Sequence, residues 1–190
     1  MKAKQKTLGL NSTYRLKVTL KGIKPPIWRR IEVSNQITLS KLHQILQVAM
    51  GWTDSHLHHF LIGETYYAEP DPEFGSDNVN ENRVKLSQLP LREKMKFYYD
   101  YDFGDNWEHE ILVEKIITVT GGNKPPVCLK GRRACPPEDI GGIWGYAEFL
   151  EAIGDPKHPD HEGILEWVGG QFDPETFELE EINRKLAKLR

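Results

Sequence analysis

The chain has 190 residues, a formal net charge of −3 and 38% hydrophobic residues, which is typical of an ordinary globular protein. No apolar run approaches the roughly 20 residues of a membrane-spanning helix, and two cysteines do not make a disulfide framework. The sequence therefore predicts a cytoplasmic protein with no membrane partner, a frayed segment over residues 1–12 and a single domain over residues 13–190.

The first thirty residues are basic and contain the first two predicted strands. They hold nine Lys or Arg residues and no Asp or Glu, although the whole chain is acidic. Apolar and polar residues alternate over residues 14–20 and again over residues 27–33, which predicts a hairpin of two half-buried strands. In the second strand, Arg29 is expected on the apolar side and Trp28 and Arg30 on the opposite side. This basic edge can pair with acids of the same chain or present a small patch to a polyanion.

A helix and a third strand follow. Apolar residues recur at helical spacing over residues 39–50, Thr38 can cap the N-terminus of this helix, and Gly51 can end it. A strand is predicted over residues 58–62. Residues 63–82 are rich in Glu, Asp, Pro and Gly and are therefore predicted to form a surface loop.

The most regular pattern in the chain is an alternation of aromatic and acidic residues over residues 96–118, with a break over residues 104–106. It predicts a β-hairpin with strands over residues 96–103 and 107–118, with the rings on one face and the acids on the other.

A three-residue turn would set the pairing within this hairpin. On the ring-bearing face the expected pairs are Phe103 with Trp107, Tyr101 with His109, and Tyr99 with Ile111. On the acidic face they are Asp102 with Glu108 and Asp100 with Glu110. Like charges directly opposite each other destabilise a sheet, so we expect water, a basic partner or a metal to compensate them.

The C-terminal part is predicted to be mainly helical. Residues 121–142 hold many Gly and Pro residues and both cysteines, which indicates an irregular connection. Amphipathic helices are predicted over residues 144–153, 160–168 and 179–189. The order of elements predicts an α+β fold: a mixed, mainly antiparallel sheet with a β-grasp-like start (β-β-α-β-β-β) and a helical section over about residues 143–190.

Several short motifs occur in order along the chain. They are Pro26-Ile27-Trp28-Arg29-Arg30, residues 52–59, the run from Tyr99 to Trp107, the run from Cys128 to Gly142, and Phe172-Asp173-Pro174. Together they resemble the plasmid pRiA4b ORF-3-like family, a group associated with plasmids, mobile elements and insertion-element passengers. The resemblance covers nearly the whole chain and implies an α+β domain with no defined reaction. Resolvase activity is not inferred from this resemblance, because the sequence shows no Ser nucleophile among Arg residues.

Histidines and cysteines are the candidate metal ligands. His56, His58 and His109 lie near many carboxylates, and this combination suits zinc or manganese. Their spacing matches no established metal motif, so local hydrogen bonds beside aromatic rings are the alternative. Cys128 and Cys135 are spaced more widely than the usual zinc pair, and two reduced thiols packed in a loop are the alternative. The sequence thus predicts no cofactor from a motif and leaves a divalent metal as an open alternative.

Trp28, Arg29 and Arg30 are the first candidate binding residues. Arg and Trp together can bind a phosphate and stack on a base. A nucleic-acid platform usually shows several exposed aromatic rings among basic residues, however, and only Trp28 does so in this segment. Pairing of these arginines within the chain, for example with Asp100 or Asp102, is therefore the favoured interpretation.

Further candidates lie in the aromatic hairpin: Asp100, Asp102, Asp105 and Trp107. Two carboxylates held close together raise the pKa of one of them, which can make a general acid. Carboxylates on the solvent side of an antiparallel hairpin are routine, however, and Asp105 can simply form the turn.

Three functions remain as hypotheses. The first is a non-enzymatic binding or adaptor domain with an unknown protein or nucleic-acid partner, because the sequence shows no complete catalytic constellation. The second is a metal-dependent hydrolase that uses His and carboxylate ligands. The third is a nucleic-acid accessory protein, which the basic first thirty residues and the mobile-element association of the family suggest.

Overall fold

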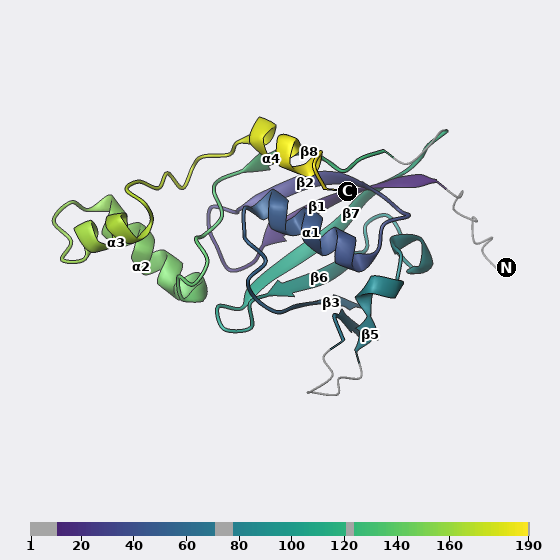
Figure 1. Ribbon diagram of the computed structural model, residues 1–190, viewed down its shortest axis with the longest axis horizontal. Coiled ribbons are helices and arrows are strands. Elements are labelled where there is room, and N and C mark those ends of the chain that lie inside the picture. Colours follow the sequence, from purple (N-terminus) through teal and green to yellow (C-terminus); the bar gives the residue numbers. More distant parts are fainter. Residues whose placement is uncertain (1–10, 71–77, 121–123, 190) are drawn as a thin grey trace.

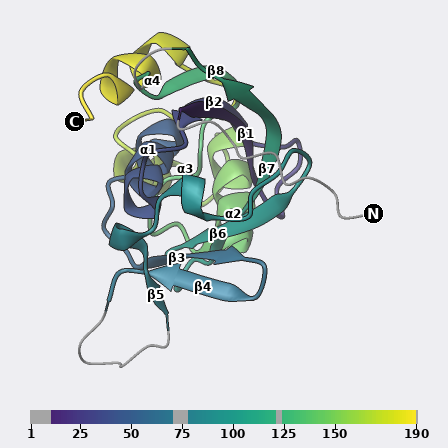
Figure 2. The same ribbon diagram turned by 90° about the vertical axis from the view of Figure 1, so that its right-hand side faces the viewer.

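An eight-stranded curved sheet forms the body of the protein in this computed structural model, which describes residues 11–70, 78–120 and 124–189. The strand order is β5-β4-β3-β6-β7-β1-β2-β8, and only the β4–β5 pair is parallel. Helix α1 lies in the concave side of the sheet (Figures 1 and 2). The α+β class and the mixed, mainly antiparallel sheet predicted from the sequence are confirmed.

The predicted start of the fold is observed. Strand β1 (Ser12–Leu20) pairs antiparallel with β2 (Trp28–Ser34), and α1 (Leu39–Met50) and β3 (His58–Ile62) follow. Residues 1–10, most of the segment expected to be frayed, lie outside the described residues.

Both ends of α1 are formed by the residues expected. Thr38 Oγ1 accepts a 3.2 Å hydrogen bond from the backbone N of Lys41, which satisfies one free N–H of the first turn. Gly51 adopts a left-handed conformation with φ 101°, which favours glycine at a helix C-terminus. The apolar side of α1 then packs on the inner face of the sheet.

The aromatic hairpin forms with a longer turn than predicted. Strands β6 (Lys96–Tyr101) and β7 (Trp107–Thr118) leave five residues in the turn, so Tyr101 pairs with Trp107 and Asp100 with Glu108. The predicted pairs, including Phe103 with Trp107 and Asp102 with Glu108, are therefore wrong, although the division of rings and strand acids between the two faces of the sheet is right.

The side chain of Asp102 explains this longer turn. Its Oδ1 accepts hydrogen bonds from the backbone N of Gly104 at 2.9 Å and of Asp105 at 3.3 Å. Asp102 and Asn106 both adopt positive φ, 59° and 55°, which Asp and Asn tolerate better than most residues. The turn therefore takes Asp102 and Phe103 out of the strand, and Phe103 is exposed.

Two stretches predicted to be irregular contain strands. The predicted loop over residues 63–82 holds β4 (Thr65–Ala68) and β5 (Val79–Asn80), and residues 121–142 hold β8 (Val127–Arg132). Strands β4 and β5 are short, and β5 and β8 lie at the two edges of the sheet. Short 3-10 turns follow β5 at Glu81–Arg83 and Leu86–Gln88. Pairing with neighbouring strands therefore produces strands where the sequence shows no alternation of apolar and polar residues.

The C-terminal helices divide into two groups. Helices α2 (Gly142–Gly154) and α3 (His161–Trp167) pack on each other and extend to one side of the sheet (Figure 1). Helix α4 (Leu179–Leu186) returns to the body and contacts β8 and α1. In the described part of the chain, no helix combines the length and apolar character that crossing a bilayer requires.

Candidate metal centre

A pocket of about 770 Å³ opens where α1, the segment before β3 and the 3-10 turn after β5 meet. Its lining includes His43, Asp54, His56, His58, Glu81 and Phe103. Histidines and acids from three separate segments therefore converge on one cavity, as sites for metals and small ligands do.

Two histidines of this pocket stack on each other. The ring centroids of His43 and His58 are 3.5 Å apart and the ring planes differ by 2°. His43 Nε2 lies 2.6 Å from Asp54 Oδ1, and His58 Nε2 lies 3.1 Å from both carboxylate oxygens of Glu81. We call these four residues the His43–His58 cluster. Ligand atoms of His43, Asp54 and His58 all lie within 4.8 Å of one another, so they can share one ion.

Neighbouring polar groups hold the cluster in place. His43 projects from the buried side of α1, and its Nδ1 lies 2.8 Å from the hydroxyl of Tyr99. Gln47, one turn later, donates to the same hydroxyl at 2.9 Å and accepts a 3.0 Å hydrogen bond from the backbone N of Asp54. Such outer contacts orient metal-binding histidines: with the proton on Nδ1 of His43 facing Tyr99, Nε2 is free to bind an ion.

The charges of the cluster favour a cation. The Glu81 residue is 2% exposed, and among the described residues its carboxylate is bonded only to His58. Burial, and then the neighbouring His58, lower the pKa of His43, so its imidazole is neutral at pH 7 and can offer a lone pair. A buried carboxylate needs a compensating positive charge. The two imidazoles and the Asp54 carboxylate form a ligand set that suits Zn²⁺ or Mn²⁺, and the Glu81 carboxylate lies beside His58.

His56 faces a different pair of acids. Its Nε2 lies 3.1 Å from Asp139 Oδ1 and 3.6 Å from Asp102 Oδ2. These three residues, which we call the His56 cluster, also place their ligand atoms within 4.8 Å of one another. The structure therefore separates His56 and His58, which the sequence suggested as ligands of one ion, into two clusters.

The other predicted metal ligands lie elsewhere. His109 is fully buried beneath the hairpin, its Nδ1 is 3.1 Å from the backbone oxygen of Tyr99, and burial lowers its pKa to about 4. Burial raises the pKa of the Cys128 and Cys135 thiols, so both are poor metal ligands and nucleophiles at neutral pH. In the described residues, neither His109 nor a cysteine joins a group of three potential ligands.

The residues of the Trp28-Arg29-Arg30 motif lie on both faces of the sheet. Arg29 is buried, and Arg30 forms a two-pronged ion pair with Glu114 at 2.6 and 2.8 Å. The predicted pairing of these arginines with Asp100 or Asp102 is therefore wrong, because β2 and β6 are separated by two strands. Trp28 lies on the outer face, with the charged groups of Lys17 and Arg30 each 5.3 Å from its ring centroid.

The acids of the hairpin have partners within the chain. Asp100 lies 2.9 Å from His59 Nε2, and Glu108 pairs with Lys21. The expected basic compensation of the like charges is thus found. Asp105 accepts hydrogen bonds at 3.1 and 3.2 Å from the backbone N of Gly141, so it joins the turn to the segment before α2. Trp107 is fully buried and therefore belongs to the core.

Three residues of the His43–His58 cluster were not among the sequence candidates. His43 had a usable signal, because it and Gln47 are polar residues one turn apart on a buried helix face. Asp54 adopts φ 61°, and Glu81 lies within the segment predicted to be a surface loop. Neither acid stands in a pattern that marks a ligand.

Comparisons with known proteins agree with the architecture. A family model described as plasmid pRiA4b ORF-3-like protein matches residues 12–181. A protein of Sinorhizobium fredii, described as uncharacterized protein y4hQ, is 42% identical over 180 residues, which covers 94% of this chain and 92% of that protein. The crystal structure of MM3350 from Methanosarcina mazei Go1, described as a protein of unknown function, has a TM-score of 0.81 and 39% identity and covers 90% of this chain and 97% of that one.

Proposed function

Starting from the fact that the chain belongs to the plasmid pRiA4b ORF-3-like family, whose relatives described above carry no stated reaction, we propose that it is a divalent-metal-dependent hydrolase. The ion is held by the His43–His58 cluster. The single observation that carries the proposal is the parallel stacking of two imidazoles whose Nε2 atoms both face carboxylates in an open pocket.

The same atoms can be joined by hydrogen bonds or by an ion. Without an ion, the N–H on Nε2 of His58 is shared between the two oxygens of Glu81, each 3.1 Å away. An ion between the imidazole edges and the carboxylates would bind both nitrogens and neutralise the buried Glu81. His43, whose Nε2 is 2.6 Å from Asp54, would then keep its proton on the side of Tyr99.

The pocket around the cluster supports a hydrolytic role. A cavity of about 770 Å³ is large enough for a small-molecule substrate. The Asp54 side chain is about half exposed, so one side of the cluster faces the solvent and leaves room for a water ligand. A bound Zn²⁺ ion lowers the pKa of its water to near 7 and so supplies a nucleophile at neutral pH. Ser40, Gln44 and Asn82 add uncharged polar groups that can hold a polar substrate.

Metal analysis tests the proposal directly. We expect chelator-treated protein dialysed against Zn²⁺ or Mn²⁺ to take up an ion in this cluster, and His58→Gln or Glu81→Gln to lower its affinity at least tenfold. His158→Gln, a partly exposed histidine in the helical section, is the matched control. Metal-stimulated cleavage of chromogenic esters or phosphoesters should be lost in His58→Gln. Unchanged metal uptake in both cluster variants would contradict the proposal and favour the binding or adaptor role.

A second candidate function is binding of single-stranded nucleic acid on the outer face of the sheet. Trp28 pairs in register with Arg132, and Arg30 pairs with both Lys17 and Lys130. In the described part of the chain, Lys17, Lys130 and Arg132 form no ion pair with an acid. Three cations around a partly exposed indole suit phosphates and a stacked base.

Salt-dependent retention of single-stranded DNA tests this second function. The double variant Lys130→Glu/Arg132→Glu should lose most of the retention, whereas Lys157→Glu, an exposed lysine in the turn between α2 and α3, should not. Retention that is insensitive to salt and to the double variant would argue against it.

A further inference from the structure

The His56 cluster brings a histidine nitrogen close to two carboxylates without forming hydrogen bonds. His56 Nε2 lies 3.1 Å from Asp139 Oδ1 and 3.6 Å from Asp102 Oδ2. This nitrogen is inaccessible to solvent and has no hydrogen-bond partner among the described residues. Nitrogen and oxygen atoms that converge in this way can serve together as ligands of one ion.

Asp102 gives an independent indication of a cation. The residue is 6% exposed, and its Oδ1 is occupied by the backbone N–H groups of Gly104 and Asp105. Its Oδ2 faces His56 Nε2 at 3.6 Å, beyond hydrogen-bond distance, and accepts no hydrogen bond from the described residues. The charge of this largely buried carboxylate has no Lys or Arg partner among the described residues, and a cation between Asp102 and His56 would neutralise it.

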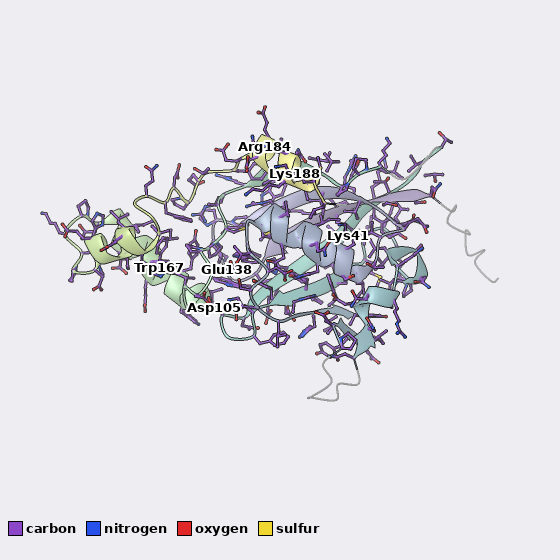
Figure 3. All side chains as sticks on the ribbon, in the orientation of Figure 1. Lys41, Asp105, Glu138, Trp167, Arg184 and Lys188 are labelled. Carbon is purple, nitrogen blue, oxygen red and sulfur yellow. The ribbon has the colours of Figure 1, made fainter. Side chains whose placement is uncertain are left out.

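Negative charge accumulates around this point. Asp102, Asp105, Glu138 and Asp139 lie on the β6–β7 turn and on the loop before α2, and in the described part of the chain none of them forms an ion pair with Lys or Arg. Figure 3 shows the labelled Asp105 and Glu138 where the sheet meets the helical section. One protonated histidine neutralises a single charge, whereas a divalent ion neutralises two.

The loop before α2 is fastened on either side of Asp139. The Pro136 carbonyl oxygen accepts a 3.0 Å hydrogen bond from Trp52 Nε1, and the Gly141 backbone N donates to Asp105 at 3.1 Å. Between these contacts Asp139 adopts φ 60°, and its side chain is largely exposed apart from the contact with His56. An ion on Asp139 would therefore close the middle of this loop onto the sheet.

We infer that a second divalent cation binds His56, Asp102 and Asp139 and fastens the loop over residues 136–141 to the β6–β7 turn. One imidazole and two carboxylates suit Zn²⁺ or Mn²⁺ better than Ca²⁺ or Mg²⁺, which favour all-oxygen sites. This site shares no ligand with the His43–His58 cluster, so it can exist with or without the proposed catalytic ion.

Two quantities test this inference: the number of ions bound per chain, and the rate at which a protease cleaves the loop over residues 136–141. Protein stripped with chelator is dialysed against Zn²⁺ and, separately, Mn²⁺, and bound metal per chain is determined by mass spectrometry. We expect Asp139→Asn and His56→Gln each to hold one ion fewer than the parent chain. Metal should slow proteolytic cleavage within residues 136–141 severalfold in the parent, but not in these variants. Asp160→Asn, an exposed acid of the helical section, is the matched control.

The outcomes separate this site from the proposed catalytic one. Loss of one ion in Asp139→Asn and of another in His58→Gln supports both sites. If His58→Gln removes all bound metal and Asp139→Asn removes none, the second site is overturned and the hydrolase proposal stands. If Asp139→Asn removes all bound metal and His58→Gln removes none, the hydrolase proposal is overturned and the second site stands. Circular dichroism without metal verifies that each variant is folded, and His56→Gln provides the test if Asp139→Asn is not.

Discussion

Arg29 donates a 2.8 Å hydrogen bond from Nε to the backbone oxygen of Ala49, which joins β2 to the last turn of α1. Its Nη1 donates at 3.0 Å to the backbone oxygen of Arg132 in β8, and its guanidinium lies 4.9 Å from the ring centroid of Phe177. No carboxylate pairs with this buried group among the described residues. Arg29 therefore links the helix, the edge strand and the C-terminal segment through backbone carbonyls and a ring.

Replacement of Arg29 should strongly destabilise the protein. We expect Arg29→Met to lower the free energy of unfolding by about 3 kcal/mol or more, because several buried carbonyls lose a charged donor. Arg30→Met is the matched control, since its ion pair with Glu114 is partly solvent-exposed and such pairs contribute about 1 kcal/mol or less. Urea denaturation of both variants measures the difference. Equal losses would show that Arg29 is not the link described.

Replacement of Trp107 tests whether this side chain belongs to the core beneath the hairpin. Its side chain is 0% exposed and lies 6.0 Å, ring centroid to ring centroid, from Trp52. We expect Trp107→Ala to cost about 3–5 kcal/mol of stability, the range for large buried aromatic residues. Trp144→Ala, at a residue that is 78% exposed, should change the stability little when measured in the same way. A small effect at Trp107 would contradict its place in the core.

Asp102 has separable roles in the turn and in the His56 cluster. In the presence of chelator, Asp102→Asn should stay within about 0.5 kcal/mol of the parent, because Asn keeps the acceptor oxygen and tolerates φ 59°. Asp102→Ala should cost about 2 kcal/mol, since two backbone N–H groups lose their acceptor and Ala is strained at this φ. Thermal unfolding with and without added Zn²⁺ should show stabilisation by metal in the parent and less in both variants.

His109 should make the protein sensitive to acid. Its pKa is lowered to about 4 in the folded chain by burial, against about 6.5 in the unfolded chain. Between these values the unfolded chain binds a proton that the folded chain does not, so stability falls as pH decreases from about 6.5 to 4, by about 3 kcal/mol in all. Urea denaturation at several pH values, with chelator present, should show a shallower pH dependence for His109→Asn. Parallel profiles for the parent and the variant would refute this assignment.

Local patterns predicted the central fold but not its edges. Alternation and helix caps identified β1, β2, α1, β3 and the aromatic hairpin, because each buries one face and carries its own periodic signal. Strand β8 has no such periodic signal. It is held in place by distant contacts instead: Gly131 packs so closely on the Phe177 ring that a Cβ there would lie 2.4 Å from it. Its place depends on a residue 46 positions later, which no short window contains.

The site was predictable only in part for the same reason. Histidines before and within β3 stood out because they are clustered in sequence. Their partners come from α1, from the 3-10 turn after β5 and from the loop before α2, as His43, Glu81 and Asp139 show. The turn around Asp102 was misjudged because side-chain hydrogen bonds to the backbone, rather than strand periodicity, determine where the hairpin ends.

The position of β1 has a consequence for how a nascent chain behaves on the ribosome. β1 pairs with β2 on one side and with β7 on the other. Val18 of β1 lies opposite Ile111 of β7, which is synthesised more than ninety residues later. Until that strand emerges, an apolar strand edge remains open to other chains. Leu186 of α4, which is also part of the core, is made later than β7. The order of synthesis therefore leaves this edge as the last side of β1 to be covered.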